Sequence, residues 1–425
     1  MDTKIYQSYL AILNSELVVA MGCTEPIAIA YAGAKARTVL GQMPEHCMVY
    51  CSGNIVKNAK GVTVPNSGGL KGIMVAAILG IAGGDATRNL AVLETVTEQD
   101  IALTQKLLAE DFCQCELLEN VAGLLIQIKV SAGQETAEVV IEDYHSNIVR
   151  ITKNGEDLFI KQNETAEKQE NEPDKALLTV KDILAFADQV KLEDVEDLLA
   201  LQIRYNTAIS QEGLDHPYGA QVGRTLMADF DSTNVKLRAK AAAAAGSDAR
   251  MSGCALPVVI NSGSGNQGIT VTMPVVEYAR EYGANREQLY RALIVSNLVA
   301  IHQKKYIGCL SAYCGAVSAA CGSGAGIAYL LGCTYEEICT TITSTIATIG
   351  GMVCDGAKPS CAAKIASAVD AALMALHLSR KNLSFQPGEG LVNEDIEKTI
   401  LNIGRMGREG MKSTDIEILN IMLGK

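Results

Sequence analysis

The sequence lacks any run of lysine and arginine dense enough to follow a phosphate backbone, and its net charge is −12, from 48 acidic and 36 basic residues. Proteins that bind nucleic acid usually present a basic surface, so we expect no nucleic acid as a partner. The first residues, 1–7, also lack an apolar core behind a basic start, which is the mark of a secretory signal. We therefore expect a cytoplasmic protein.

Charge is absent from two long segments, 251–276 and 307–334. By length alone each segment could cross a membrane. Both are rich in glycine, serine, asparagine and cysteine and poor in leucine and phenylalanine, which favours the buried interior of an enzyme. We expect no membrane partner, and we interpret the 13 cysteines as reduced thiols and metal ligands rather than as a disulfide framework.

The cysteines do not follow the tight CxxC spacing of zinc or ferredoxin sites. Instead, Cys354 and Cys361 lie seven positions apart within GMVCDGAKPSC at 351–361, and Cys314 lies forty positions before Cys354. Pro359 and Ser360 are typical of helix starts, so Cys361 is expected in a first turn, where free N–H groups stabilise a thiolate. The residues alone leave two interpretations open, which are a metal site and three small buried side chains.

These three cysteines, together with MGCTEP at 21–26 and VPNSGG at 64–69, resemble the L-cysteine desulfidase family, which is related to the iron–sulfur serine dehydratases. The resemblance covers nearly the whole chain. It implies a [4Fe-4S] cluster held by Cys314, Cys354 and Cys361, with one iron left to bind the substrate and no pyridoxal phosphate.

Cys23 is expected at the start of a helix, because Thr24 suits an N-cap and Pro26 suits the first turn. A buried cysteine between two helices would have the same pattern. The resemblance implies a role for Cys23 beside the cluster, either as a fourth iron ligand at rest, which we favour, or as a proton-transfer group. Thr24 and Glu25 are then candidate substrate-binding residues.

Two further segments are candidates for holding a substrate carboxylate. Ser67 and Gly68 lie in a glycine-rich stretch ahead of an apolar helix, where free N–H groups could bind an anion, although a plain turn explains the same residues. Arg250 could bind a carboxylate through two parallel hydrogen bonds, although Asp248 and Arg250 could equally be a solvated pair of charges.

The stretch 261–268 gathers amides, hydroxyls and glycines between apolar runs, which suits a zwitterion but also a turn without a ligand. Its candidate substrate-binding residues are Asn261, Ser262, Ser264, Asn266 and Gln267. Further on, His302 is a candidate general base and Lys304 or Lys305 a candidate carboxylate clamp, the alternative being a histidine at a helix end beside surface lysines.

The pattern of the whole chain predicts an α+β protein. Short β-branched runs and two helical stretches fill 46–160, the polar segment 161–175 is expected as an exposed linker, and 176–425 is expected as a helical catalytic domain. We expect the N-terminal helices at 1–45 to pack on that catalytic domain.

The function implied is a lyase that converts L-cysteine and water to pyruvate, ammonia and hydrogen sulfide. Its partner would be a small amino-acid substrate, and a homodimer is one assembly open to it. The alternatives are an iron–sulfur serine dehydratase and a non-catalytic iron–sulfur or zinc redox sensor. The forty- and seven-residue spacings and the GCTEP segment differ from the serine dehydratases and favour sulfur as the leaving group.

Overall fold

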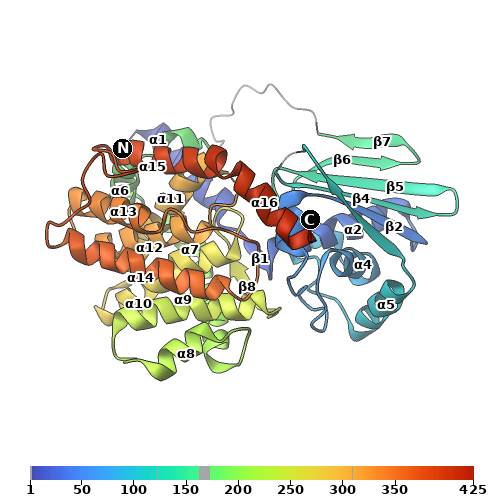
Figure 1. The fold of residues 1–425 in the computed structure, drawn as a ribbon, viewed down its shortest axis with the longest axis horizontal. Helices are drawn as coiled ribbons and strands as arrows, with labels where there is room; N and C mark the ends of the chain where they lie inside the picture. The colour runs from blue at the N-terminus through green and yellow to red at the C-terminus, as the bar shows by residue number, and fades with distance from the viewer. Residues whose placement is uncertain (1, 122, 162–172, 309) are drawn as a thin grey trace.

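The computed structural model describes residues 2–121, 123–161, 173–308 and 310–425, which form two lobes (Figure 1). One lobe contains a six-stranded sheet and the other is mostly helical, which confirms the α+β class. Most of the segment predicted as a linker lies outside the described residues, and so does Cys309.

The sheet of the first lobe has the strand order β3-β2-β4-β5-β6-β7. Its β2–β3 pair is parallel and every other pair is antiparallel. Side chains at alternate positions of β4, namely Ile126, Ile128 and Val130, are buried, as their alternation in the sequence predicts. The strands are β2 (His46–Ser52), β3 (Cys113–Leu118), β4 (Leu125–Ala132), β5 (Glu135–Glu142), β6 (Ile148–Lys153) and β7 (Glu156–Ile160).

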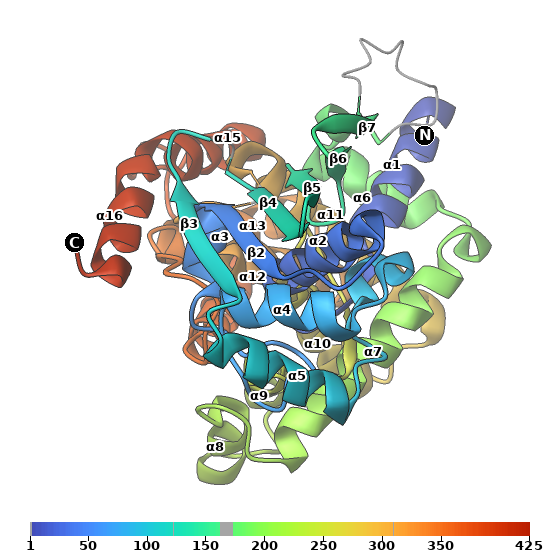
Figure 2. The same ribbon diagram turned by 90° about the vertical axis from the view of Figure 1, so that its right-hand side faces the viewer.

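Helices cover one face of this sheet, as Figure 2 shows from the side of the sheet lobe. Two of them, α2 and α4, cross closely, because a Cβ atom on Gly80 would lie 2.1 Å from the carbonyl oxygen of Ala30. Only glycine allows the two backbones this approach. The helices of this lobe are α2 (Thr24–Leu40), α3 (Gly53–Ala59), α4 (Ile73–Gly83) and α5 (Glu98–Ala109), with a 3-10 turn at Ala86–Ala91.

The second lobe packs its helices around α9, α12 and α14. Within the described ranges, α14 alone is long and apolar enough to cross a membrane, but it packs against α9, α12 and α13 as a core helix. The helices are α1 (Thr3–Glu16), α6 (Val180–Gln189), α7 (Glu196–Asp215), α8 (Val222–Asp229), α9 (Val235–Met251), α10 (Gly265–Glu281), α11 (Arg286–Ile307), α12 (Gly315–Leu330), α13 (Tyr335–Ile349), α14 (Cys361–Ser379), α15 (Ile396–Arg405) and α16 (Lys412–Leu423).

Segments at both ends of the chain join the lobes. The N-terminal region is divided between them, since α1 packs on the helical lobe while α2 packs on the sheet. Between these two helices, β1 (Val19–Met21) pairs with β8 (Pro257–Val259) of the helical lobe. At the other end of the chain, α16 crosses from the helical lobe to contact α3.

Some local expectations differ from the structure. The β-branched run at 62–64 makes only an isolated bridge between Thr63 and Lys71, because a glycine-rich turn folds it back. The stretch 261–268 is not one loop, since its second half is the first turn of α10.

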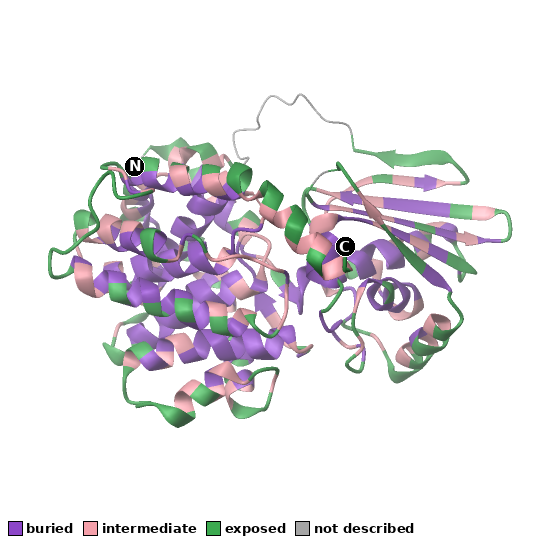
Figure 3. Ribbon diagram, viewed as in Figure 1, coloured by how far each residue is buried: buried purple, intermediate pink, exposed green. Residues whose placement is uncertain are grey.

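The uncharged segments 251–276 and 307–334 are mostly buried among the described residues, and Figure 3 shows the buried core continuing through both lobes.

Candidate active site

The loop that carries Cys354 is joined to the loop that carries Cys314 by backbone hydrogen bonds. The Cys314 N–H donates to the Met352 carbonyl at 3.1 Å, and the Cys354 N–H donates to the Ala312 carbonyl at 2.6 Å. An antiparallel bridge between Tyr313 and Val353 lies between these bonds. Two cysteines forty positions apart in sequence are therefore held side by side.

Three of the four candidate cysteines lie at a helix start or directly before one, and Cys354 lies in the loop ahead of α14. Cys314 is the N-cap of α12, Cys361 is the first residue of α14, and Cys23 is the N-cap of α2. Free N–H groups at such positions favour negative charge. Cys23 and Cys361 also pack in one cluster of side chains, so all four cysteines surround the same space.

The loop between Cys354 and Cys361 is fixed from both sides. A Cβ atom on Gly356, whose φ is +97°, would lie 2.3 Å from the Lys57 carbonyl oxygen, so only glycine fits against α3 here. On the other side, Lys364 pairs with the Asp355 carboxylate and donates to the Val353 carbonyl at 2.9 Å.

The chemistry of this donor set fits a cationic iron–sulfur group. Burial, with a smaller contribution from the neighbouring Cys354 thiol, raises the pKa of Cys314 to about 12, so thiolates here need compensating positive charge. Among the described residues, no three His, Cys, Asp or Glu side chains converge on one point as a single metal ion requires. A cluster distributes its cysteines over several irons, so cysteines spread over the walls of one cavity are compatible with such a group.

The four cysteines line a cavity of about 100 Å³, which we call the inner cavity. The structure places most of the predicted substrate residues on the same walls. Predicted site residues that line the inner cavity are Cys23, Thr24, Glu25, Arg250, Ser262, Ser264, Asn266, Gln267, Lys304, Cys314, Cys354 and Cys361.

Arg250 is a buried guanidinium on the wall of the inner cavity, with a residue exposure of 2%. It donates to Asn266 Oδ1 at 3.2 Å, its Nε has no hydrogen-bond partner, and no carboxylate pairs with it within the described ranges. A buried cation is costly unless an anion compensates it. The interpretation of Asp248 and Arg250 as a solvated pair of charges is therefore wrong, because both side chains are buried and Asp248 accepts its hydrogen bond from another residue.

Asp248 accepts a hydrogen bond from the Gly223 N–H at 3.0 Å, and burial raises its pKa from 3.8 to about 6. The folded-state pKa of Asp248 lies above its unfolded-state pKa, so ionisation of this group destabilises the fold. Its contribution to the free energy of unfolding is fully present below pH 4 and is lost as pH rises to about 6. Asp248→Asn should therefore raise the free energy of unfolding at pH 8 by up to about 3 kcal/mol and leave it unchanged near pH 4. Thermal melting across this range tests it, with exposed Asp229→Asn as the control; a gain that is constant with pH contradicts it.

Comparison with known proteins shows the family to which the chain belongs. A family model described as serine dehydratase alpha chain matches residues 87–420, which include Cys314, Cys354 and Cys361. The chain belongs to the serine dehydratase alpha chain family. It is also 52% identical to a UPF0597 protein of Lachnoclostridium phytofermentans over 99% of this chain and 100% of that one, and 50% identical to one of Desulfitobacterium hafniense over 99% and 98%.

Serine dehydratase alpha chain proteins are iron–sulfur lyases that act without pyridoxal phosphate. The match extends over both lobes of this family member, from the 3-10 turn at Ala86–Ala91 to α16. The names of its relatives state no substrate. The residues of the inner cavity therefore belong to a member of a lyase family.

Cys23 and Glu25 are in direct contact at the start of α2 in this family member. The Cys23 thiol donates to Glu25 Oε2 at 3.1 Å, and the Thr24 hydroxyl donates to the same oxygen at 3.2 Å and to the Gly263 carbonyl at 3.0 Å. Burial strongly raises the pKa of Cys23, and Glu25 raises it further. The thiol is thus protonated and oriented by the carboxylate in the structure described.

Four predicted site residues do not line the inner cavity of this dehydratase-family chain. Ser67 is buried and donates to the Leu70 carbonyl, in the same turn as Gly68. The turn supports Cys23 indirectly, because its Pro65 packs against Gly22. Asn261 donates to Asn297 Oδ1 at 3.0 Å and so braces the turn that positions Ser262 and Ser264.

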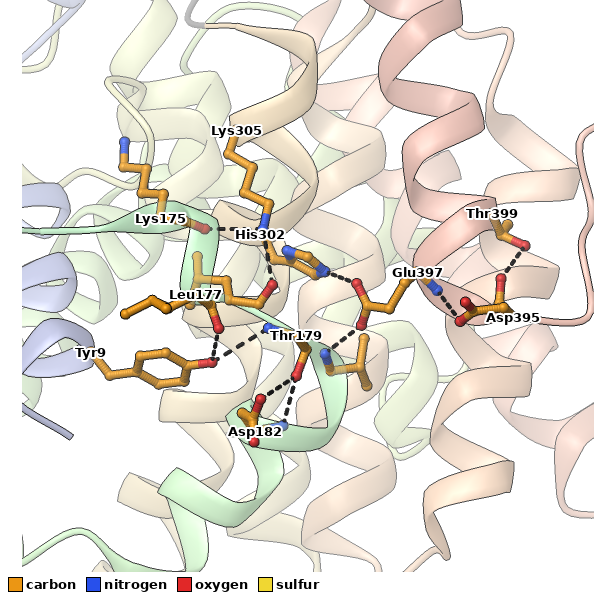
Figure 4. A network of polar contacts seen from close by, with 12 residues as sticks. Tyr9, Lys175, Leu177, Thr179, Asp182, His302, Lys305, Asp395, Glu397 and Thr399 are labelled. Carbon is orange, nitrogen blue, oxygen red and sulfur yellow. Dashed lines mark hydrogen bonds and ion pairs between the residues drawn. The ribbon is translucent and has the colours of Figure 1, made fainter. Parts of the chain in front are cut away.

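The fourth, His302, lies inside α11 and is fully buried, so it is neither at a helix end nor at the surface. Its Nε2 lies 2.6 Å from Glu397 Oε2, and Glu397 also accepts from the Val180 N–H at 2.7 Å (Figure 4). Burial lowers the pKa of His302, which Glu397 partly offsets. Figure 4 shows these bonds tying α11 to α15 and to the start of α6, so His302 is placed as a structural group.

Several residues of the inner cavity were missed by the sequence analysis. Asn58 from α3, Ser311 and Tyr313 line it, and Tyr313 is fully buried with a hydroxyl that has no hydrogen-bond partner among described residues. His145, from the sheet lobe, lies 3.7 Å from Glu25 Oε1 through its Nε2. No motif surrounds these residues, and only the folding of distant segments brings them together.

Proposed function

We propose that the chain is an L-cysteine desulfidase, a lyase that converts L-cysteine and water to pyruvate, ammonia and hydrogen sulfide with a [4Fe-4S] cluster held by Cys314, Cys354 and Cys361. The observation that carries the proposal is one small cavity lined by four cysteines, a buried unpaired guanidinium and a buried carboxylate.

An amino acid matches the charges of this cavity. Arg250 would bind the substrate carboxylate through parallel N–H groups, with Asn266 and Gln267 beside it. Glu25 would bind the ammonium group, because burial raises its pKa but His145 and Cys23 lower it to about 2, so it remains a carboxylate. The ends of an α-amino acid would then be fixed, leaving the β-substituent to reach the cysteines.

The residues of the chain orient the substrate and exclude water. When bound, the cluster would supply a Lewis-acidic iron that binds the substrate thiolate and makes hydrosulfide a better leaving group. Lys304 on the cavity wall would add positive charge near the carboxylate as the α-proton leaves. Elimination of hydrosulfide gives aminoacrylate, which reacts with water to form pyruvate and ammonia without a net change of oxidation state.

Serine dehydration is the second candidate, because the family model carries that name. The same Arg250 and Glu25 would bind L-serine, and the difference lies only in the leaving group. Cys23 favours sulfur, since its thiol already occupies the position beside the cluster cysteines that a substrate thiol would take.

The test is an assay of anaerobically reconstituted protein with L-cysteine, L-serine and 3-chloro-L-alanine, in which pyruvate and sulfide are both measured. We expect brown protein and stoichiometric pyruvate and sulfide from L-cysteine, at a kcat/KM well above that for L-serine. Pyruvate from L-serine alone would replace desulfidase by dehydratase. Colourless protein holding one zinc per chain, without turnover, would remove the lyase proposal.

A further inference from the structure

His145 belongs to the sheet lobe and reaches Glu25 at the start of α2. It lies in the connection between β5 and β6, where Asp143 adopts a φ of +66° and donates its N–H to the Leu124 carbonyl at 3.1 Å. The Asn147 N–H donates to the Tyr144 carbonyl and its side chain donates to the Glu142 carbonyl at 2.8 Å. The connection is therefore a closed, hydrogen-bonded turn that presents His145 in one direction.

The imidazole is buried, with 6% of the residue exposed, and its Nε2 has no hydrogen-bond partner among the described residues. The nearest carboxylate is Glu25, whose Oε1 is 3.7 Å from Nε2. Gly263 packs beside the ring, since a Cβ atom there would lie 3.5 Å from His145 Cε1, which is an ordinary contact distance. A buried imidazole aimed at a buried carboxylate is costly unless the two interact.

Glu25 thus has two oxygens with two separate neighbours. Oε2 accepts from Cys23 and Thr24, and Oε1 faces His145. A carboxylate held on one side only can rotate about its last bond, whereas contacts on both oxygens fix its plane. The plane of Glu25 decides whether it can meet an ammonium group in the inner cavity.

A second cavity, of about 1260 Å³, lies on the other side of this contact. It lies between the lobes and shares Ser262, Gly263 and Lys304 with the inner cavity, while His145 lines only this outer one. A substrate that passes from the outer cavity to the inner one meets the wall that His145 and Gly263 form.

We propose that His145 is a positioning residue of the sheet lobe, which holds the Glu25 carboxylate in the plane that binds the ammonium group of an amino-acid substrate. This rests on the proposed function, because it assigns the ammonium to Glu25. It makes the connection between β5 and β6 part of the recognition of the substrate, in addition to the start of α2.

The experiment compares holoenzyme and two variants, His145→Ala and His145→Gln, using L-cysteine as substrate and 3-mercaptopropionate as an inhibitor that lacks the ammonium group. We expect His145→Ala to raise the KM for L-cysteine about tenfold, with kcat changed less than about threefold and the inhibition constant of 3-mercaptopropionate unchanged. His145→Gln, which can still donate to Glu25, should restore much of the affinity. The iron content and visible spectrum should match those of the unmodified protein.

The control is His216→Ala, which removes a histidine that lies 3.1 Å from Glu212 on the exposed end of α7. It should leave both constants unchanged. An equal loss of affinity for L-cysteine and 3-mercaptopropionate in His145→Ala, or wild-type constants in that variant, would overturn the positioning role. Failure of the unmodified protein to turn over any of the three substrates would instead overturn the proposed function.

Discussion

Replacement of Cys354 by serine should remove the iron from the protein, from about four irons per chain to less than about one, and abolish sulfide release. The same result is expected for Cys314→Ser and Cys361→Ser, because the three side chains line one cavity and each is a proposed permanent ligand. A serine hydroxyl is a poor ligand for iron where a thiolate is required. Iron analysis and the visible spectrum of anaerobically purified variants measure the effect.

Cysteines outside the cavity provide the matched control. Cys333 and Cys339 are half-buried and do not line it, so their serine variants should keep the colour and the activity. Cys321 is fully buried inside α12, and its serine variant should also keep the iron. Loss of iron from Cys321→Ser with retention in Cys314→Ser would show that the ligand assignment is wrong.

Cys23 should behave differently from the other three. If it binds iron only at rest, Cys23→Ala retains much of the iron and loses activity, oxygen resistance or both. The contact with Glu25 makes a proton-transfer role the second option, and that role predicts retained iron and a loss of kcat. Complete loss of iron from Cys23→Ala would make it an obligate ligand and would contradict both roles.

Arg250→Met should lower kcat/KM for L-cysteine by about 100-fold or more, because loss of a buried charge partner costs about 3 kcal/mol. The Arg250 guanidinium is buried in the wall of the cavity, and no carboxylate among the described residues neutralises it. The iron content should stay the same.

The specificity of this effect can be measured with cysteamine, which has a thiol and an ammonium group but no carboxylate. Its inhibition constant should be the same for Arg250→Met and the unmodified protein. Arg280→Met, which removes an exposed guanidinium paired with Glu277, is the control and should change neither constant. A large loss of cysteamine binding in Arg250→Met would mean that Arg250 supports the fold of the cavity rather than the carboxylate.

The α+β class could be predicted from the sequence because its signals are local. The alternation of Ile126, Ile128 and Val130 and the start of a helix at Cys361 need no knowledge of distant residues. The relation to the iron–sulfur serine dehydratases could be recognised for a similar reason, since GMVCDGAKPSC is continuous, whereas the specificity for L-cysteine is a proposal. Polar side chains of 262–267 line one cavity, although the structure divides them between a turn and α10, and their role in substrate binding stays a prediction.

His145 and Tyr313 could not be predicted as cavity residues, because their roles depend on contacts with residues more than a hundred positions away or on burial that local pattern does not encode. His302 shows the reverse limit. It has the residue type of a general base and lies close to Cys314 in sequence, but its position on α11 points the side chain to Glu397 instead of the cavity. Residue type and spacing do not fix the direction of a side chain.

The contact of α16 with α3 has a consequence for how the site is assembled. Asp415 of α16 pairs with Lys57, the Lys60 ammonium donates to the Met422 carbonyl at 3.0 Å, and the carbonyl of Lys57 is the surface against which Gly356 fits. The helix that clamps α3 follows all four cavity cysteines in the sequence. During synthesis on the ribosome, all four cysteines are therefore made before the helix whose contacts with α3 complete the support of the Cys354 loop.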